Sequence, residues 1–356
     1  MELKKSFDKK DTLVVKGMAV LLMLFYHLFQ TRELLEQLQV NYKPFSQEVF
    51  LTLSGFGNIC VAVFAFLSAY GITKGLMAKE DMSPSGMMRE AGRRCLRLIG
   101  NFAVMYLSVN LLWFSYFDYA GLYGGGWQGG LLAVIDMLGL AQLLGTPIMN
   151  MTWWYMELAV LIIFAVPFLY LLVKKIGGYS LILAVLLPLA AELNEDVKRY
   201  FVVIVLGVAA ARGGWLEKLF GFRCSRLVKG AAGVALIALS IVFRQNYMVH
   251  TYFLWIADAP IAFLLCWFGG EILSAVPGLR QVLAFFGKHS MNIFFVHTFF
   301  YLAIYQKFIY SFRYAALIFL VLAAVTLAYS VALELLKTGG RALWKRRPGA
   351  RAGRKE

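Results

Sequence analysis

Eleven long apolar runs limit the folds open to this chain more than any other feature of its sequence does. They cover 13–30, 49–76, 98–117, 131–146, 153–173, 179–193, 198–214, 227–244, 251–275, 283–306 and 314–336. A helix of about 20 apolar residues can cross the hydrocarbon core of a bilayer. Because backbone polar groups inside a bilayer must bond to one another, we expect an all-α, polytopic transmembrane helical bundle.

Composition points to the same environment. Of the 356 residues, 60% are hydrophobic and 15% are charged, and the mean hydropathy is +0.69. Soluble domains contain about 25% charged residues. We therefore expect a multi-pass protein of the cell membrane, such as the inner or cytoplasmic membrane of a bacterium. The four cysteines have no paired spacing, so neither a disulfide framework nor a metal site is indicated.

The charge pattern predicts the number of spans. Both ends of the chain are basic, which favours two cytosolic termini and an even number of spans. The run 131–146 is short, contains Asp136, and follows the segment GLYGGGWQGG. We expect it to form a re-entrant or interfacial helix on the outer side, which leaves about ten spans. Anionic lipid beside the basic cytosolic face accounts for the net charge of +15, so no nucleic-acid partner is required.

With ten spans, 28 of the 35 Lys and Arg residues lie on the cytosolic side. The chain then divides into three parts. A cytosolic N-terminus (1–12) precedes a transmembrane domain (13–336), and a basic cytosolic tail (337–356), which we expect to be disordered, follows it. No further domain follows the last run in this sequence, so we expect any transfer reaction to be direct or to be completed by a separate partner.

The first run, LVVKGMAVLLMLFYHLF, carries Lys16 near its start and His27 near its end. Eleven residues make almost three helical turns, so both side chains share one face, about 16 Å apart along the axis. The charge pattern places Lys16 at the cytosolic edge. Imidazole titrates near neutrality, so His27 is a candidate base or nucleophile. The alternatives are a histidine that bonds to another helix and a lysine that extends to the membrane surface.

A second basic cluster precedes the third run. It contains Arg89, Arg93, Arg94 and Arg97, of which Arg94 and Arg97 are three residues apart and share a helix face. Guanidinium groups match phosphate oxygens, which indicates a site for a phosphorylated ligand at the cytosolic surface. The alternative is that these arginines only set the topology of the chain.

Five segments of the sequence occur in the order LVVKGMAVLLMLFYHLF, VFAFLSAYGITKGL, RRCLRLIGNF, WWYMELAVLIIFAVPFL and FGKHSMNIFFVHTFF. In order and spacing they resemble successive blocks of the acyltransferase 3 family of integral membrane acyltransferases. The resemblance covers about residues 8 to 336. It implies a ten-span fold that moves an acyl group, usually acetyl, from cytosolic acyl-coenzyme A to a hydroxyl of a cell-surface glycan, a lipid-linked acceptor or a related acceptor outside the cell.

The resemblance also implies roles for particular residues. His27 would remove the proton of the acceptor hydroxyl or take the acyl group itself. Coenzyme A carries phosphates at one end, which suits a basic entrance formed by Lys16, Arg93, Arg94 and Arg97. Lys16 stands where arginine is commoner in the family, which preserves the charge but not the forked contact. No permanently bound cofactor and no metal is expected.

Six further residues are candidates for the walls of the site. The family blocks place Ser68, Trp154, Tyr155, Glu157, Ser290 and His297 there. Glu157 could orient His27 or bind an acceptor hydroxyl. The alternatives are helix packing for the serine in the second run, an aromatic belt at the membrane surface for the Trp and Tyr residues, and a structural role for the second histidine.

A second class of function remains open from the sequence. A proton-coupled secondary transporter could use His27, Glu157 and Asp258 as a proton relay. Such transporters usually contain related halves with interrupted helices, and we find no such symmetry in this sequence. The oligomeric state and the identity of the acceptor do not follow from the residues.

Overall fold

The computed structural model describes residues 6–79, 82–191, 195–247 and 251–346. In this part of the chain the structure is helical and contains no strand, with one isolated β-bridge between Asn41 and Tyr314. The α-helices are α1 (Lys9–Leu28), α2 (Arg32–Gln37), α3 (Gln47–Phe56), α4 (Cys60–Met77), α5 (Pro84–Trp113), α6 (Tyr119–Tyr123), α7 (Gly126–Met137), α8 (Tyr155–Ile176), α9 (Tyr179–Ala190), α10 (Glu195–Gly213), α11 (Trp215–Phe220), α12 (Arg226–Tyr247), α13 (Thr251–Glu271), α14 (Pro277–Thr298), α15 (Gln306–Tyr310) and α16 (Ala315–Arg346). The all-α prediction is confirmed.

Seven helical segments among the described residues are long and apolar enough to cross a membrane. They are Lys9–Leu28, Gln47–Met77, Pro84–Tyr116, Met151–Ile176, Arg226–Gln245, Leu254–Ala275 and Ala315–Gly339. Three of the predicted runs, 179–193, 198–214 and 283–306, correspond instead to α9, α10 and α14. The first of these has 12 residues, about 18 Å of helix, which is less than the hydrocarbon thickness. The run 131–146 gives only the short helix α7 and the turns after it.

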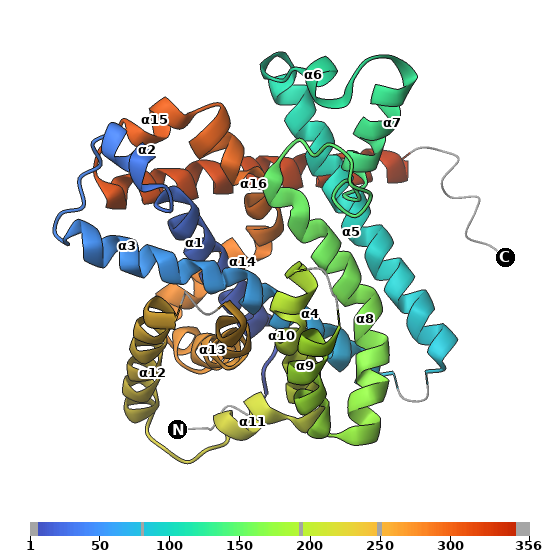
Figure 1. Cartoon of the computed structure of the whole chain (residues 1–356), viewed down its shortest axis with the longest axis vertical. Coiled ribbons are helices and arrows are strands. Elements are labelled where there is room, and N and C mark those ends of the chain that lie inside the picture. The colour runs from blue at the N-terminus through green and yellow to red at the C-terminus, as the bar shows by residue number, and fades with distance from the viewer. Residues whose placement is uncertain (1–5, 80–81, 192–194, 248–250, 347–356) are drawn as a thin grey trace.

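The helices α1 and α14 lie at the centre of the bundle (Figure 1). Gly17 of α1 and Gly287 of α14 make their crossing possible, because a Cβ atom at either would overlap a backbone carbonyl of the other helix. Close backbone approach at small residues is the usual way in which membrane helices associate. Contacts at Gly17 and Gly287 near the middle of the two helices, and again at His27 and His297 near their C-terminal ends, show that the helices run parallel.

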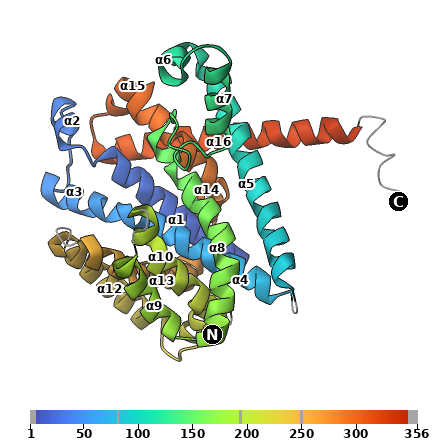
Figure 2. The same ribbon diagram turned by 45° about the vertical axis from the view of Figure 1, so that its right-hand side comes forward.

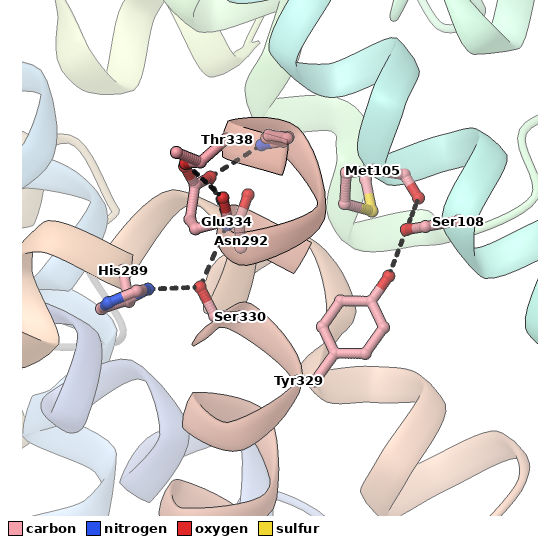
Figure 3. Close-up of polar contacts among 9 residues, drawn as sticks. Met105, Ser108, His289, Asn292, Tyr329, Ser330, Glu334 and Thr338 are labelled. Carbon is pink, nitrogen blue, oxygen red and sulfur yellow. Dashed lines mark hydrogen bonds and ion pairs between the residues drawn. The ribbon is translucent and has the colours of Figure 1, made fainter. Parts of the chain in front are cut away.

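Polar side chains hold α14 against α16 on a face of α14 that does not carry Ser290. His289 Nδ1 lies 2.9 Å from the Ser330 hydroxyl, and the Asn292 amide donates to Ser330 at 3.0 Å and to Glu334 at 3.1 Å (Figure 3). Glu334 also pairs with Lys337 at 2.8 Å. These contacts account for one of the carboxylates that lies in an apolar run.

The C-terminal part of α16 extends away from the other helices (Figure 2). The helix continues to Arg346, so the first ten residues of the predicted tail are helical. The rest of that tail, 347–356, and the first five residues of the predicted N-terminal segment lie outside the described residues.

Two further carboxylates inside the bundle are neutralised by buried cations. Asp258 of α13 pairs with Arg244 of α12, and both side chains are almost fully buried. Glu271 pairs with Lys229 at 2.9 Å. A buried charge is tolerated when a partner of opposite charge and hydrogen bonds replace water. Asp258 is thus tied to an arginine, with no direct contact to His27 or Glu157 in the structure.

Hydrogen bonds hold together the segment 118–150, which contains α6 and α7. The Tyr106 and Tyr123 hydroxyls are 3.1 Å apart, and Tyr123 donates to Asp136 at 2.5 Å. The Met149 amide donates to the same carboxylate oxygen at 2.8 Å. Burial raises the pKa of Asp136 above its ordinary value, although the hydrogen bonds from Tyr123 and Met149 act in the opposite direction.

Candidate active site

A cavity of about 400 Å³ lies between α1, α4, α5, α8 and α14. Most of its wall is apolar. Its polar lining comes mainly from five of the residues that the sequence singles out, namely Lys16, Ser68, Arg94, Tyr155 and Ser290. These residues lie on five helices, so the fold brings together side chains that are up to 274 positions apart in the sequence. A largely apolar pocket with a few polar groups is the usual form of a ligand site.

Two cations, Lys16 and Arg94, line this cavity. Lys16 forms no hydrogen bond or ion pair within the part of the chain that the structure describes, and Arg94 Nε lies 3.3 Å from Glu90. The Arg94 guanidinium packs over Gly75 of α4, where a Cβ atom would come within 2.8 Å of it. The Lys16 ammonium, which has no partner among the described residues, and the Arg94 guanidinium in the same cavity suit an anionic group such as phosphate.

The other two predicted arginines do not line the cavity. The side chains of Arg93 and Arg97 are 56% and 70% exposed, and both lie near Glu90, which also binds Lys79 at 3.0 Å. Glu90 therefore lies close to four basic side chains, Lys79, Arg93, Arg94 and Arg97. The prediction that Arg94 and Arg97 share a continuous helix is confirmed by α5, but only Arg94 lines the cavity.

The deeper wall of the cavity carries three hydroxyl groups. Ser68 of α4 lies within hydrogen-bonding reach of the Tyr155 hydroxyl. Ser290 of α14 also lines the cavity, and its hydroxyl donates to the Gly287 carbonyl at 3.0 Å. No hydrogen bond joins Ser68 to His27 among the described residues.

His27 and His297 form a pair at the C-terminal ends of α1 and α14. Their ring centroids are 4.9 Å apart and the ring planes are inclined by 58°. His297 is fully buried, and its Nδ1 donates to the Phe294 carbonyl at 2.7 Å. Its Nε2 has no hydrogen-bond partner among the described residues, which leaves it as an acceptor for a donor that enters the site. His27 Nδ1 lies 3.4 Å from the exposed Gln30 side-chain amide.

The crossing of α1 and α14 explains why the histidines meet. Gly17 precedes His27 by ten residues, and Gly287 precedes His297 by ten residues. Because the two parallel helices touch at these glycines, equal steps of about 15 Å bring the two imidazoles to the same height. The repeated spacing of glycine and histidine is a sequence signal that would have predicted this pair.

Three aromatic rings in the wall of the cavity pack on one another, and one of them, Phe294, also contacts His297. Phe64 of α4, Tyr155 of α8 and Phe294 of α14 all line the cavity, and their ring centroids are 5.0 to 6.3 Å apart. We call these three rings the aromatic ceiling. The Phe294 centroid lies 6.1 Å from that of His297. Neither Phe64 nor Phe294 stands out in the sequence, because phenylalanine is common throughout this chain.

Two more of the predicted residues, Glu157 and Trp154, do not line the cavity. Glu157 accepts a hydrogen bond from the Leu143 backbone amide, so it holds the segment after α7, and its catalytic role stays a prediction. Trp154 stacks on Tyr200 with centroids 6.1 Å apart. Trp153 is buried and donates to the Phe295 carbonyl at 2.9 Å, which ties this segment to α14. An aromatic belt at the membrane surface does not describe Trp153.

The fold and the site define a class of protein in which membrane helices enclose a cavity. Two cations line this cavity, and its aromatic wall contacts a histidine pair. The comparison of sequences identifies the family. The model of the acyltransferase domain family matches residues 13–335, and the chain belongs to this family. No curated protein and no solved structure gave a match. The protein is therefore a membrane acyltransferase.

Proposed function

We propose that this membrane protein is an O-acyltransferase that moves an acetyl group from cytosolic acetyl-coenzyme A to a hydroxyl of a glycan or lipid-linked acceptor outside the cell. The proposal includes ten spans, with both termini in the cytosol and α7 on the outer side. The observation that supports it is the course of α1, whose N-terminal half carries Lys16 in the wall of the cavity that Arg94 also lines and whose C-terminal end carries His27.

The cavity suits coenzyme A because its ends differ in chemistry. Lys16 and Arg94 can bind phosphate oxygens, while the apolar wall can enclose the pantetheine arm. The thioester would then reach the wall formed by Ser68 and Tyr155. Arg93 and Arg97 increase the positive potential at the entrance, which attracts an anionic donor without direct contact.

The transfer step needs one proton acceptor. As the oxygen of the acceptor hydroxyl bonds to the thioester carbonyl carbon, His27 takes the hydroxyl proton. The carbon–sulfur bond then breaks, and the same proton passes to the coenzyme A thiolate. His297 is a positioning residue in this scheme, because its buried ring packs against His27 and its Nε2 can accept a hydrogen bond from the acceptor.

Replacement of His27 tests this function. Purified wild-type protein and His27→Ala are compared for the loss of radiolabelled acetyl from acetyl-coenzyme A, by transfer or hydrolysis. General-base catalysis contributes about 10²–10⁴-fold, so we expect turnover to fall by at least 100-fold. Binding of coenzyme A, measured by calorimetry, should persist because His27 lies beyond the aromatic ceiling. Undiminished turnover in His27→Ala would disprove the assignment.

A further inference from the structure

The aromatic ceiling is a single packed layer of side chains. Tyr155 and Phe294 are in closest contact, with centroids 5.0 Å apart, and Phe64 lies 6.3 Å from Tyr155 and 6.2 Å from Phe294. Phe64 and Phe294 are buried, with exposed fractions of 8% and 5%. Three different helices supply the rings, so none of them can move without changing its contact with the other two.

The histidine pair contacts this layer through Phe294. Phe294 and His297 are three residues apart on α14, about 4.5 Å along the helix axis, and their centroids are 6.1 Å apart. His27 follows at 4.9 Å from His297. A thioester in the cavity would thus meet Phe294, the ring that packs on His297, and an acyl carbon that moves from the cavity to an acceptor at His27 would pass this layer.

We propose that the aromatic ceiling selects the size of the transferred acyl group and restricts transfer to short acyl chains. This inference rests on the proposed function, because it takes the cavity as the site of acyl-coenzyme A. A two-carbon group requires a small separation of the rings, and each further methylene requires a wider one. Packed layers resist such separation, and a single methylene changes discrimination by about 10–200-fold in a closely fitting pocket.

Reduction of one ring tests the selection. Phe64→Leu and Phe294→Leu each shorten one member of the ceiling and keep an apolar side chain. For both we expect the ratio of hexanoyl-coenzyme A to acetyl-coenzyme A turnover to rise at least tenfold over wild type. The use of two variants on different helices guards against a folding defect in one of them, and coenzyme A affinity is measured in parallel to show that the cavity is intact.

Phe66→Leu is the matched control. Phe66 lies two residues from Phe64 on α4 and is fully buried, but it packs on Tyr70 and Phe263, with centroids 6.0 and 5.9 Å away, and does not line the cavity. The same substitution there should leave the preference for acyl chain length as in wild type. A rise of the ratio in Phe66→Leu equal to that in Phe64→Leu would mean that general loosening of the bundle, and not the ceiling, sets the preference.

The outcomes separate this inference from the proposed function. If wild type turns over acetyl-coenzyme A and depends on His27, but neither ceiling variant changes the ratio, the ceiling is not the selector. An equal loss of turnover with both donors in the two variants would also overturn the selection. If wild type shows no turnover that depends on His27, the proposed function fails first, and the selection fails with it.

Discussion

Arg94 and Arg97 are three residues apart on α5, yet their surroundings differ. Arg94 lines the cavity beside Lys16, whereas the Arg97 side chain is 70% exposed. A hydrogen bond to a charged group is worth about 1.5–3 kcal/mol, so Arg94→Ala should weaken acetyl-coenzyme A binding by at least tenfold. Arg97→Ala should weaken it less than threefold. Calorimetry of the two variants checks this, and equal losses would contradict the assignment of Arg94 to the cavity.

Gly75 offers a way to disturb Arg94 without removing its charge. In Gly75→Ala the new Cβ would overlap the Arg94 guanidinium, which must shift, while no backbone atom is obstructed. We expect weaker acetyl-coenzyme A binding with little change in thermal stability. Gly92→Ala on α5 is the control, because a Cβ there meets nothing within 4 Å. Identical affinities in the two variants would show that the position of the Arg94 fork does not matter.

Among the single residues of the site, the polar ones could be predicted from the sequence, whereas the apolar ones could not. Lys16, His27 and His297 stand out in the sequence because hydrocarbon does not accept polar groups without a reason. Phe64 and Phe294 could not be singled out, because their role depends on which helices meet. Glu157 shows the limit of the polar signal, since its carboxylate binds the Leu143 amide.

Among the elements, the parallel contact of α1 and α14 does most to build the site. Gly17→Ala or Gly287→Ala would press a methyl group into the backbone of the other helix, and overpacking costs about 1–3 kcal/mol. We expect a lower unfolding temperature and a loss of turnover, because the histidines would no longer meet. Gly278→Ala on α14 has free space and serves as control. Normal turnover in Gly17→Ala would contradict the role of the crossing.

The stability of the segment 118–150, which contains α6 and α7, should change with pH because of Asp136. Its pKa is raised in the folded protein, so the protonated carboxyl contributes stability at low pH, and this contribution is lost as the pH rises through the raised pKa. Asp136→Asn keeps an acceptor for Tyr123 and Met149 but cannot titrate. We expect hydrogen-exchange protection of residues 118–150 to fall in wild type as the pH rises above the ordinary pKa of an aspartate, but not in this variant. The same pH slope in both proteins would refute the prediction.

The apolar runs of the sequence predicted most of the long helices, but they did not predict every helix boundary or interruption. The run 49–76 corresponds to α3 and α4, which a 3₁₀ turn at Gly57–Ile59 separates. The run 283–306 overlaps α14 and continues through the π-helical turn Phe299–Ala303. α14 is not among the seven apolar segments although it carries His297, because its polar residues make contacts within the protein, including that of His289 with Ser330. Hydropathy alone therefore does not identify a helix that carries a candidate site residue.

At the scale of the whole molecule, the number of spans decides where the termini lie. Seven spans would place them on opposite sides, whereas ten spans, which include α9, α10 and α14, place both in the cytosol. We expect a fluorescent protein that matures only in the cytosol to fluoresce when it is fused to either terminus of the full chain. Fluorescence from only one of the two fusions would favour an odd number of spans.

The parallel direction of α1 and α14 agrees with ten spans, because both helices would then run from the cytosol to the outer side. The proposed transfer across the membrane depends on this arrangement, since it requires the cations of the cavity to face one compartment and the histidine pair the other. The sequence predicts this polarity from charge alone, but the closeness of His27 and His297 depends on a contact between distant parts of the chain.

Turnover measured from each side of a sealed vesicle tests the central claim most directly. Protein is reconstituted in liposomes, molecules of one orientation are selected by an accessible N-terminal tag, and labelled acetyl-coenzyme A is supplied to one compartment at a time. We predict that the label leaves coenzyme A only when the donor is on the side of the N-terminus, and that it then appears in the opposite compartment. Equal turnover from both sides, or label that stays on the side of the donor, would contradict the account.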